Sequence, residues 1–478
     1  MPEQYEMFWE VYALDRQEYL TSLTDQIRAK RARDMVAKEV EAHIEDQKQD
    51  FIAHGFGEVE AEAMAVAEMG DPVETGVKLD RIHRPKMEWT VLTAIIVISI
   101  MGLILQAVIT SSFPTMNMST MEALKDNFLY GGLWSAMLIG IAVMLVICYM
   151  DYSILVEWAF PIWIILQVPA VLSIFTNIFF DETIWIGPMV NGRSMFQMIL
   201  SYLVIPFYAG TIYHFRGKGK KGLIISTVCL GISVLTNLMI PFMSSALVTG
   251  ITGLILLHVA ICKGWFGENK KKFLAKMWGV IGICLILMRG VTFLSNGHFI
   301  TDYQVHRLEA LFTGEHWDYT RSAVADVANA AKNPDSSEWI EAQSSGNIKV
   351  TDPYNESTEV GAITLYNYAR NDYIWTYLFH YFGTAKGIFL VIVFAAFLGL
   401  LLRMAVKQKN RLGYMISIGC VLYLALQSLF YIGVNAGLCP IGGNYMPFLS
   451  HGNMTMMITY FYMGILLSVY RNTNIVKN

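Results

Sequence analysis

Ten apolar runs of about 20 residues make up most of this 478-residue chain. A helix rises about 1.5 Å per residue, so each run can cross a hydrocarbon core of roughly 30 Å. Lipid offers no partner to backbone N–H and C=O groups, and a helix satisfies these groups within its own segment. The sequence therefore predicts ten membrane-spanning helices, at 89–110, 131–150, 153–176, 195–214, 222–240, 243–262, 276–295, 383–403, 412–434 and 450–470.

Composition supports an all-α polytopic membrane protein. Hydrophobic residues make up 54% of the chain and charged residues only 15%, which is far from the balance of soluble proteins. The net charge of −4 argues against a nucleic-acid-binding surface. The six cysteines fall in or near the spans without paired spacing, which is typical of inert core thiols.

The short loops predict the orientation of the chain. The sequences "HFRGKGKKG", "KGWFGENKKKF" and "RMAVKQKNR" follow the fourth, sixth and eighth spans and hold most of the loop cations. Cationic loops stay on the cytoplasmic side. We therefore expect both termini in the cytoplasm and a large external loop, residues 296–371, between spans seven and eight.

Residues 1–86 differ from the rest and predict a small cytoplasmic domain of about three helices. Apolar residues recur there at helical spacing, Gly55 and Gly57 interrupt the pattern, and "GDP" ends it. The segments "KEVEAHIEDQ" and "GFGEVEAEAMAVAEMGDP" resemble the HAAS, or permease-prefix, domain of various bacterial membrane proteins. That resemblance implies an interaction or regulatory module ahead of a membrane domain at residues 87–478.

Polar residues gather where the ninth span ends and the tenth begins. Gln427 and Asn435 lie near the outer end of span nine, and Pro440, Gly443 and Pro447 follow in a short external turn. Ser450, His451, Gly452 and Asn453 then open span ten. Free N–H groups at a helix start favour anions such as phosphate. A simple polar helix cap is the alternative reading.

This ending resembles the SEDS family of bacterial cell-wall polymerases, the FtsW/RodA/SpoVE group. The family pattern "Q…N…G..P.TG.PLPF.SYGGSS…G.LLS..R" is matched in order by Gln427, Asn435, Gly437, Pro440, Gly443, Pro447, Phe448, Ser450, Gly452, Gly464, Leu467, Ser468 and Arg471. Upstream, "NDYIWTYLFHYFG" matches the family's entry into the eighth span, and "YQVHRLEALF" matches the start of its large outer loop. The resemblance covers roughly residues 89–475.

The resemblance implies a peptidoglycan glycosyltransferase that polymerises lipid II, an undecaprenyl-pyrophosphate-linked disaccharide, on the outer face of the bacterial cytoplasmic membrane. It makes Asp372 the general base for the sugar 4-hydroxyl. It places substrate contacts at Arg307, Gln304, Arg321, Ser322, Gln427, Asn435, Pro440, Gly443, Pro447, Ser450 and Gly452. The charge of the pyrophosphate adds Arg370 on the outer loop and Arg289 inside span seven as cationic contacts, with pairing to a carbonyl or a carboxylate as the alternative reading of Arg289. A class B penicillin-binding protein is the expected partner. Charge also allows Mg²⁺ or Mn²⁺ at the pyrophosphate, although no ligand cluster in the sequence demonstrates one.

The chain departs from the family pattern at several places. "RSAVADVANAAKNPDSSEW" replaces a glycine-rich stretch, Phe242 replaces the acid of "PDLGTA", and His380 and Tyr381 occupy the usual "EE" pair. Two other functions stay open at this point: a transporter of the lipid-linked precursor, and a catalytically silent membrane scaffold. Asp372 itself has a plainer reading as a solvated carboxylate beside an interfacial aromatic belt.

Overall fold

The computed structural model describes residues 15–112, 132–180, 189–190, 193–239, 243–267, 269–279, 282, 369–436, 438 and 445–473. The chain divides into two compact units. The first holds Met1–Glu88, Gln408–Arg411 and Val469–Asn478, and the second holds Trp89–Lys407 and Leu412–Ser468.

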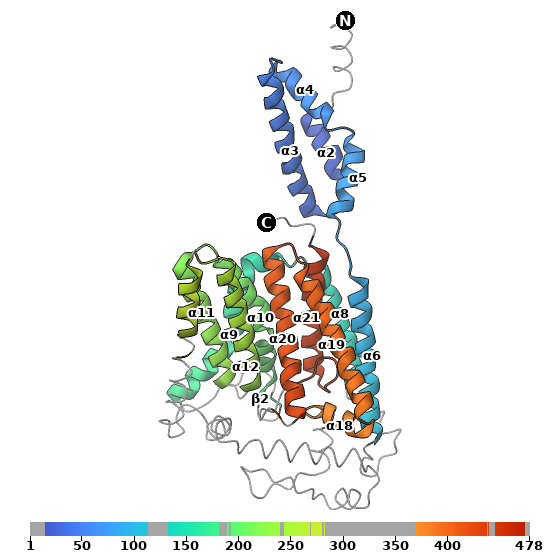
Figure 1. Cartoon of the computed structure of the whole chain (residues 1–478), viewed down its shortest axis with the longest axis vertical. Helices are drawn as coiled ribbons and strands as arrows, with labels where there is room; N and C mark the ends of the chain where they lie inside the picture. Colours follow the sequence, from blue (N-terminus) through green and yellow to red (C-terminus); the bar gives the residue numbers. More distant parts are fainter. Residues whose placement is uncertain are drawn as a thin grey trace, which may run out of the picture. The chain divides into compact units, whose positions relative to one another are not determined.

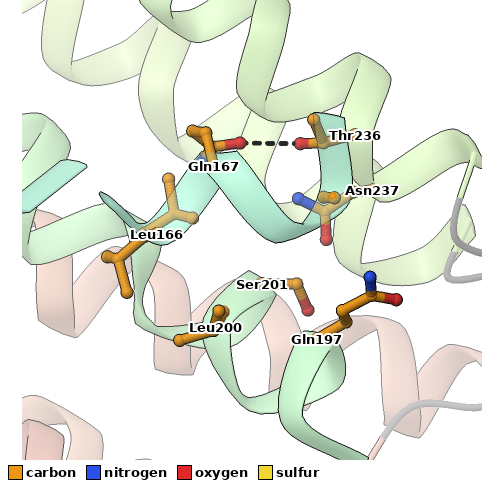
Figure 2. A pocket seen from close by; sticks show the side chains of 9 residues that line it. Leu166, Gln167, Gln197, Leu200, Ser201, Thr236 and Asn237 are labelled. Atoms are coloured by element: carbon orange, nitrogen blue, oxygen red, sulfur yellow. Dashed lines mark hydrogen bonds between the residues drawn. The ribbon is translucent and has the colours of Figure 1, made fainter. Parts of the chain in front are cut away.

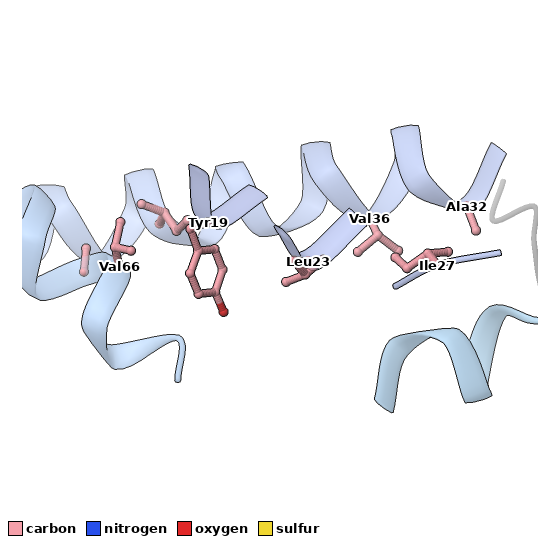
Figure 3. Close-up of a cluster of buried hydrophobic side chains, with 8 residues drawn as sticks. Tyr19, Leu23, Ile27, Ala32, Val36 and Val66 are labelled. Atoms are coloured by element: carbon pink, nitrogen blue, oxygen red, sulfur yellow. The ribbon is translucent and has the colours of Figure 1, made fainter. Parts of the chain in front are cut away.

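Four helices lie in residues 15–88, the described N-terminal part of the first unit, where the sequence suggested about three. They are α2 (Arg16–Asp25), α3 (Lys30–Ala53), α4 (Glu58–Glu68) and α5 (Pro72–His83). Their shared core contains Tyr19 and Leu23 of α2, Val36 of α3 and Val66 of α4, each at most 4% exposed (Figure 3). Apolar residues at helical spacing thus bury one face of each of these three helices against the others.

The "GDP" segment works as a helix start. Asp71 precedes α5, and its Oδ1 accepts a hydrogen bond from the Val73 N–H at 3.1 Å. Pro72 takes the first helical position, where a missing N–H costs nothing. One turn later, a Cβ on Gly76 would lie 2.5 Å from the carbonyl oxygen of Leu23, so only glycine lets α5 approach α2 this closely.

The second unit is a bundle of membrane helices (Figure 1). Its described helices are α6 (Trp89–Ser112), α8 (Leu133–Tyr149), α9 (Ile154–Phe180), α10 (Met195–His214), α11 (Gly219–Met239), α12 (Met243–Cys262), α18 (Ile374–Tyr381), α19 (Thr384–Val406), α20 (Arg411–Asn435) and α21 (Asn453–Arg471). A two-residue strand pair, β1 (Met189–Val190) with β2 (Arg193–Ser194), is a small departure from the all-α prediction.

A multi-pass membrane protein is confirmed. Six helices among the described residues are long and apolar enough to cross a membrane. Nine of the ten predicted spans coincide with a described helix. The predicted seventh span, 276–295, lies mostly outside the described residues, so the count of ten and the large loop after it stay predictions. Helix α9 runs through both Pro161 and Pro169.

Small residues and buried polar pairs bring the membrane helices together. A Cβ on Gly140 of α8 would lie 2.2 Å from the ring of Tyr460 on α21, so these two helices are in close contact. The Tyr462 hydroxyl of α21 donates to the carbonyl of Tyr202 on α10 at 2.7 Å. Such contacts suit a lipid environment, where packing and interhelical hydrogen bonds replace the hydrophobic effect between helices.

The core of the N-terminal helices gives a stability prediction. Leu23 is fully buried, so Leu23→Ala should lower the unfolding free energy of this region by about 2–5 kcal/mol. Val59 is 86% exposed, and Val59→Ala should change it by less than about 0.5 kcal/mol. Limited proteolysis of the full-length protein in urea measures both. Equal protection of the two variants would contradict the core assigned here.

Candidate active site

Asp372 lies in a tight turn between the helical residues Ala369–Arg370 and the start of α18. The carbonyl of Arg370, at the beginning of this turn, accepts two hydrogen bonds. One comes from Nε2 of Gln106 on α6 at 3.0 Å, and the other comes from the backbone N–H of His451 at 3.0 Å. The start of the turn is therefore fixed by the first membrane helix and by the segment just before α21.

The next two carbonyls of the turn are held as well. The carbonyl of Asn371 accepts from the Tyr431 hydroxyl at 2.5 Å and from Ser450 Oγ at 3.1 Å. The carbonyl of Asp372 accepts from Nδ2 of Asn435 at 2.9 Å. Three successive carbonyls of residues 370–372 thus have partners from segments distant in the sequence. We call residues 370–372 the Asp372 turn.

Helix α20 also fixes the backbone that follows. The Ile374 N–H donates to the Tyr431 hydroxyl at 3.0 Å, and the Thr376 N–H donates to Asn435 Oδ1 at 3.0 Å. Tyr431 and Asn435 are four residues apart and so lie on one face of α20. These donors belong to the first turn of α18, where N–H groups lack partners within the helix. The same two side chains therefore hold the Asp372 turn and cap α18.

The segment from Tyr445 to Ser450, which we call the closing turn, supplies the third support. Ser450 Oγ accepts from the Met446 N–H at 2.7 Å while donating to the Asp372 turn. Every residue of the closing turn is buried. Phe448 has φ +65°, a left-handed conformation that costs energy for a side chain of this size. That cost is offset by the hydrogen bonds and packing that surround the turn.

The side chain of Asp372 is only partly covered, although the backbone that carries it is fixed. Asp372 is half-buried, whereas Tyr373 to Leu378 behind it are buried. A carboxylate on a backbone held at three successive positions loses little freedom when it meets a substrate. The geometry therefore suits a base whose position is set before the substrate binds.

Arg370 and His451 bring a charged and a polar side chain close to each other at the Asp372 turn. Arg370 is only 4% exposed, which differs from the expectation of a side chain on an open loop. The pKa of His451 is lowered to about 4. Burial is the larger cause, and the positive charge of the nearby Arg370 guanidinium is the smaller one. His451 precedes the start of α21 by two residues and is therefore a neutral imidazole near pH 7.

Other predicted site residues support the backbone. Gln427 is fully buried and its Nε2 donates to the carbonyl of Tyr445 at 3.3 Å. Pro447 belongs to the closing turn, and a Cβ on Gly452 would lie 2.6 Å from Thr455 Oγ1. Direct substrate contact by these residues stays a prediction. Arg289, Gln304, Arg307, Arg321, Ser322, Pro440 and Gly443 lie outside the described residues.

No cation site is visible in the part of the chain that the structure describes. There, no three side chains of His, Cys, Asp or Glu come together as a ligand group. A divalent cation at the pyrophosphate therefore stays a prediction.

A small cavity lies elsewhere in the bundle, between α9, α10 and α11 (Figure 2). Its lining includes Gln167, Ser201 and Asn237, and Thr236 Oγ1 donates to Gln167 Oε1 at 2.8 Å. Its volume of about 10 Å³ is enough for about one water. No residue of the Asp372 turn lines it.

Two supports of the Asp372 turn were missed by sequence reasoning. Gln106 is an isolated amide in the apolar helix α6, and Tyr431 sits four residues before Asn435. A buried amide in a membrane helix is a usable signal, because it needs a hydrogen-bond partner in another segment. The partner itself is a backbone carbonyl, which no sequence motif marks.

Comparison with known proteins decides the family. The FtsW/RodA/SpoVE family model, described as "Cell cycle protein", matches residues 88–475. The chain belongs to this family. The match leaves out the N-terminal helices, so the resemblance of residues 1–86 to a prefix domain stays a prediction.

Individual relatives agree with the family. The chain is 35% identical over 102 residues to a probable peptidoglycan glycosyltransferase FtsW of Synechocystis, covering 20% of this chain and 26% of the relative. The Bacillus subtilis protein of the same name is 24% identical over 361 residues, covering 72% of this chain and 82% of that one. The chain spans only about a quarter of the length of the first curated relatives that it matches.

A solved structure has the same fold. It is described as "Structural coordination of polymerization and crosslinking by a peptidoglycan synthase complex". The TM-score is 0.54 at 15% sequence identity, and the match covers 81% of this chain and 98% of that one. At this identity the likeness concerns the fold.

The partly buried His451 gives a pH prediction. Its folded-state pKa of about 4 lies below the ordinary 6.5, so the unfolded state binds the proton more tightly. The contribution of His451 to the free energy of unfolding is constant above about pH 6.5. As the pH drops from there toward 4, the free energy of unfolding falls by at most about 1.4 kcal/mol per pH unit. Between pH 7.5 and 5, His451→Gln should lose less thermal stability than the wild type. Equal losses would contradict this burial.

Proposed function

We propose that this chain is a peptidoglycan glycosyltransferase that polymerises lipid II into glycan strands, with Asp372 as its general base. The observation that carries the proposal is the Asp372 turn: three successive carbonyls are held while the carboxylate beside them stays half-buried. Membership of the FtsW/RodA/SpoVE family supports it. So do the names of relatives, which are called probable peptidoglycan glycosyltransferases.

The proposed reaction joins two lipid-linked sugars. The Asp372 carboxylate takes the proton of the 4-hydroxyl of one precursor, and the resulting oxygen attacks the anomeric carbon of the other. A new glycosidic C–O bond forms as the C–O bond to the pyrophosphate breaks, and the pyrophosphate keeps that electron pair. A well-placed general base contributes about 10²–10⁴-fold to such a step.

The leaving pyrophosphate needs positive charge. Arg307, Arg321 and Arg289 are the proposed cationic contacts, and Gln304 and Ser322 the polar ones. Preorganised cations stabilise charge that develops in the transition state. Mg²⁺ or Mn²⁺ would supply the same neutralisation. Arg370 belongs to the Asp372 turn and is 4% exposed, and a contact of its guanidinium with the substrate stays a prediction.

Location and partner follow from the same proposal. The enzyme sits in the bacterial cytoplasmic membrane with both termini in the cytoplasm, because the cationic loops favour that side. Asp372 then faces the outer leaflet, where lipid II is polymerised. The similar solved structure is a complex that joins polymerisation to crosslinking, which supports a class B penicillin-binding protein as partner.

The two alternative functions are less well supported. A transporter predicts charged residues deep in several spans, and the sequence places few there beyond Arg289. A silent scaffold would have no use for the hydrogen bonds that fix the Asp372 turn beyond general stability.

The direct test is polymerisation of lipid II by the purified protein, with a transpeptidase partner supplied where needed. Asp372→Asn should keep the size of the side chain and lower chain synthesis by about 10²-fold or more, because an amide cannot accept the proton. Asp352→Asn, a matched change in the predicted external loop, should leave the rate within about twofold. Glycan chains resolved by size give the readout, and equal activity of Asp372→Asn and wild type removes Asp372 from the mechanism.

A further inference from the structure

The first membrane helix carries one buried amide that lies outside the family motifs quoted above. Gln106 is 2% exposed in α6, a helix otherwise rich in apolar residues. The opposite side of the same helix exposes Val97, Ile100 and Ile104, each between 48% and 58%, as expected for side chains that face lipid. Gln106 therefore lies on the inner face of α6, where a polar group needs partners.

Both partners of this amide are backbone carbonyls. Gln106 Nε2 donates to the carbonyl of Arg370 at 3.0 Å and to the carbonyl of Leu449 at 2.6 Å. An amide NH₂ has two hydrogens, so both of its donors are used. One side chain of α6 thus joins the Asp372 turn to the closing turn, two segments about 80 residues apart in the chain.

Close approach of the α6 backbone makes this contact possible. One turn before Gln106, a Cβ on Gly102 would lie 2.1 Å from the carbonyl oxygen of Phe448. That oxygen belongs to the residue with the left-handed backbone, φ +65°. The conformation of Phe448 and the missing side chain of Gly102 therefore let α6 lie directly against the closing turn.

The two hydrogen bonds of Gln106 constrain the position of Asp372 in two ways. Gln106 holds the carbonyl of Arg370, two residues before Asp372. It also holds Leu449, which precedes Ser450, and Ser450 Oγ donates to the carbonyl of Asn371. Without the Gln106 amide, two buried carbonyls would lose a donor, which favours a rearrangement of both turns.

We propose that Gln106, seated by Gly102, is the positioning residue through which the first membrane helix sets the place of the Asp372 carboxylate. This inference rests on the proposed function for its effect on catalysis, but its structural part stands alone. Gln106 touches no reacting atom and acts through the backbone of residues 370–372. A displacement of about 1 Å at a reacting group can cost 10²-fold in rate.

Gln106→Met tests the proposal in the full-length protein, because methionine keeps the length of the side chain and removes both donors. Hydrogen exchange of a peptide covering 369–381 is the first readout. We expect the amides of Ile374 and Thr376 to exchange at least about tenfold faster, since their acceptors hold the same turn. The polymerisation rate is the second readout, and kcat should fall about tenfold or more with KM within about twofold.

Gln167→Met is the matched control. Gln167 is a 5% exposed amide in α9 whose Oε1 accepts from Thr236, away from the Asp372 turn. This variant loses a buried hydrogen bond too, so its thermal stability should fall while kcat and exchange in 369–381 stay at wild-type values. A kcat loss of equal size in both variants would reduce Gln106 to a structural role and overturn the proposal.

Gly102→Ala is a second variant, which leaves the amide in place and pushes α6 away from Phe448. It should reproduce the faster exchange in 369–381 and the loss of kcat. Wild-type exchange in both Gln106→Met and Gly102→Ala would overturn the inference, whatever the enzyme makes. A wild-type protein that makes no glycan chains would instead contradict the proposed function, and the exchange data would still decide the structural claim.

Discussion

Three consecutive backbone carbonyls, those of Arg370, Asn371 and Asp372, have hydrogen-bond donors from elsewhere in the chain. The active-site account depends on this constraint. A turn of this kind between membrane helices would otherwise expose carbonyls to a medium that cannot satisfy them. Because α6, α20 and the segment before α21 supply the donors, the backbone that carries Asp372 is held from three sides. A buried carbonyl without a hydrogen-bond donor is costly, so these three carbonyls are paired, and the pairing fixes the backbone at the candidate active site.

The supports follow from a few polar residues in apolar helices. Asn435 illustrates how much one side chain does: Oδ1 accepts from the Thr376 N–H, and Nδ2 donates to the carbonyls of Asp372 and Tyr431. Loss of such a residue leaves several buried groups without partners at once, and each costs about 1–3 kcal/mol. Residues that look like substrate ligands in a motif can therefore be essential for another reason. Here the side chains of Asn435 and Ser450 donate hydrogen bonds to the backbone that carries Asp372.

The sequence predicts the helices well, because a 20-residue apolar run has few alternatives in a membrane. Helix α19 begins at Thr384, one residue from the predicted start of the eighth span, and α12 has the predicted bounds. The start of α5 was missed, because "GDP" was read as the end of a helix although Asp71 and Pro72 also form a standard helix opening. Hydropathy alone did not show that Arg370 is buried, because the segments that bind its backbone, Gln106 of α6 and His451 before α21, are distant in the sequence.

The candidate site was predicted only in part. The family motif pointed to Asp372, Asn435 and Ser450, and the structure brings these three residues together. The family motif could not reveal Gln106, Gly102 or the left-handed Phe448, because their roles depend on the position of backbone carbonyls in space. Polar side chains are visible in a sequence, whereas the carbonyls they hold are not.

The most direct test of the account is a cryo-electron-microscopy structure of the full-length Asp372→Asn protein in lipid with bound lipid II. The account predicts that residue 372 lies within about 3 Å of a sugar hydroxyl, the distance that proton transfer requires. It also predicts that the backbone of 370–372 keeps its hydrogen bonds to Gln106, Tyr431 and Asn435. Sugar density bound elsewhere, with residue 372 turned into the protein, would contradict it.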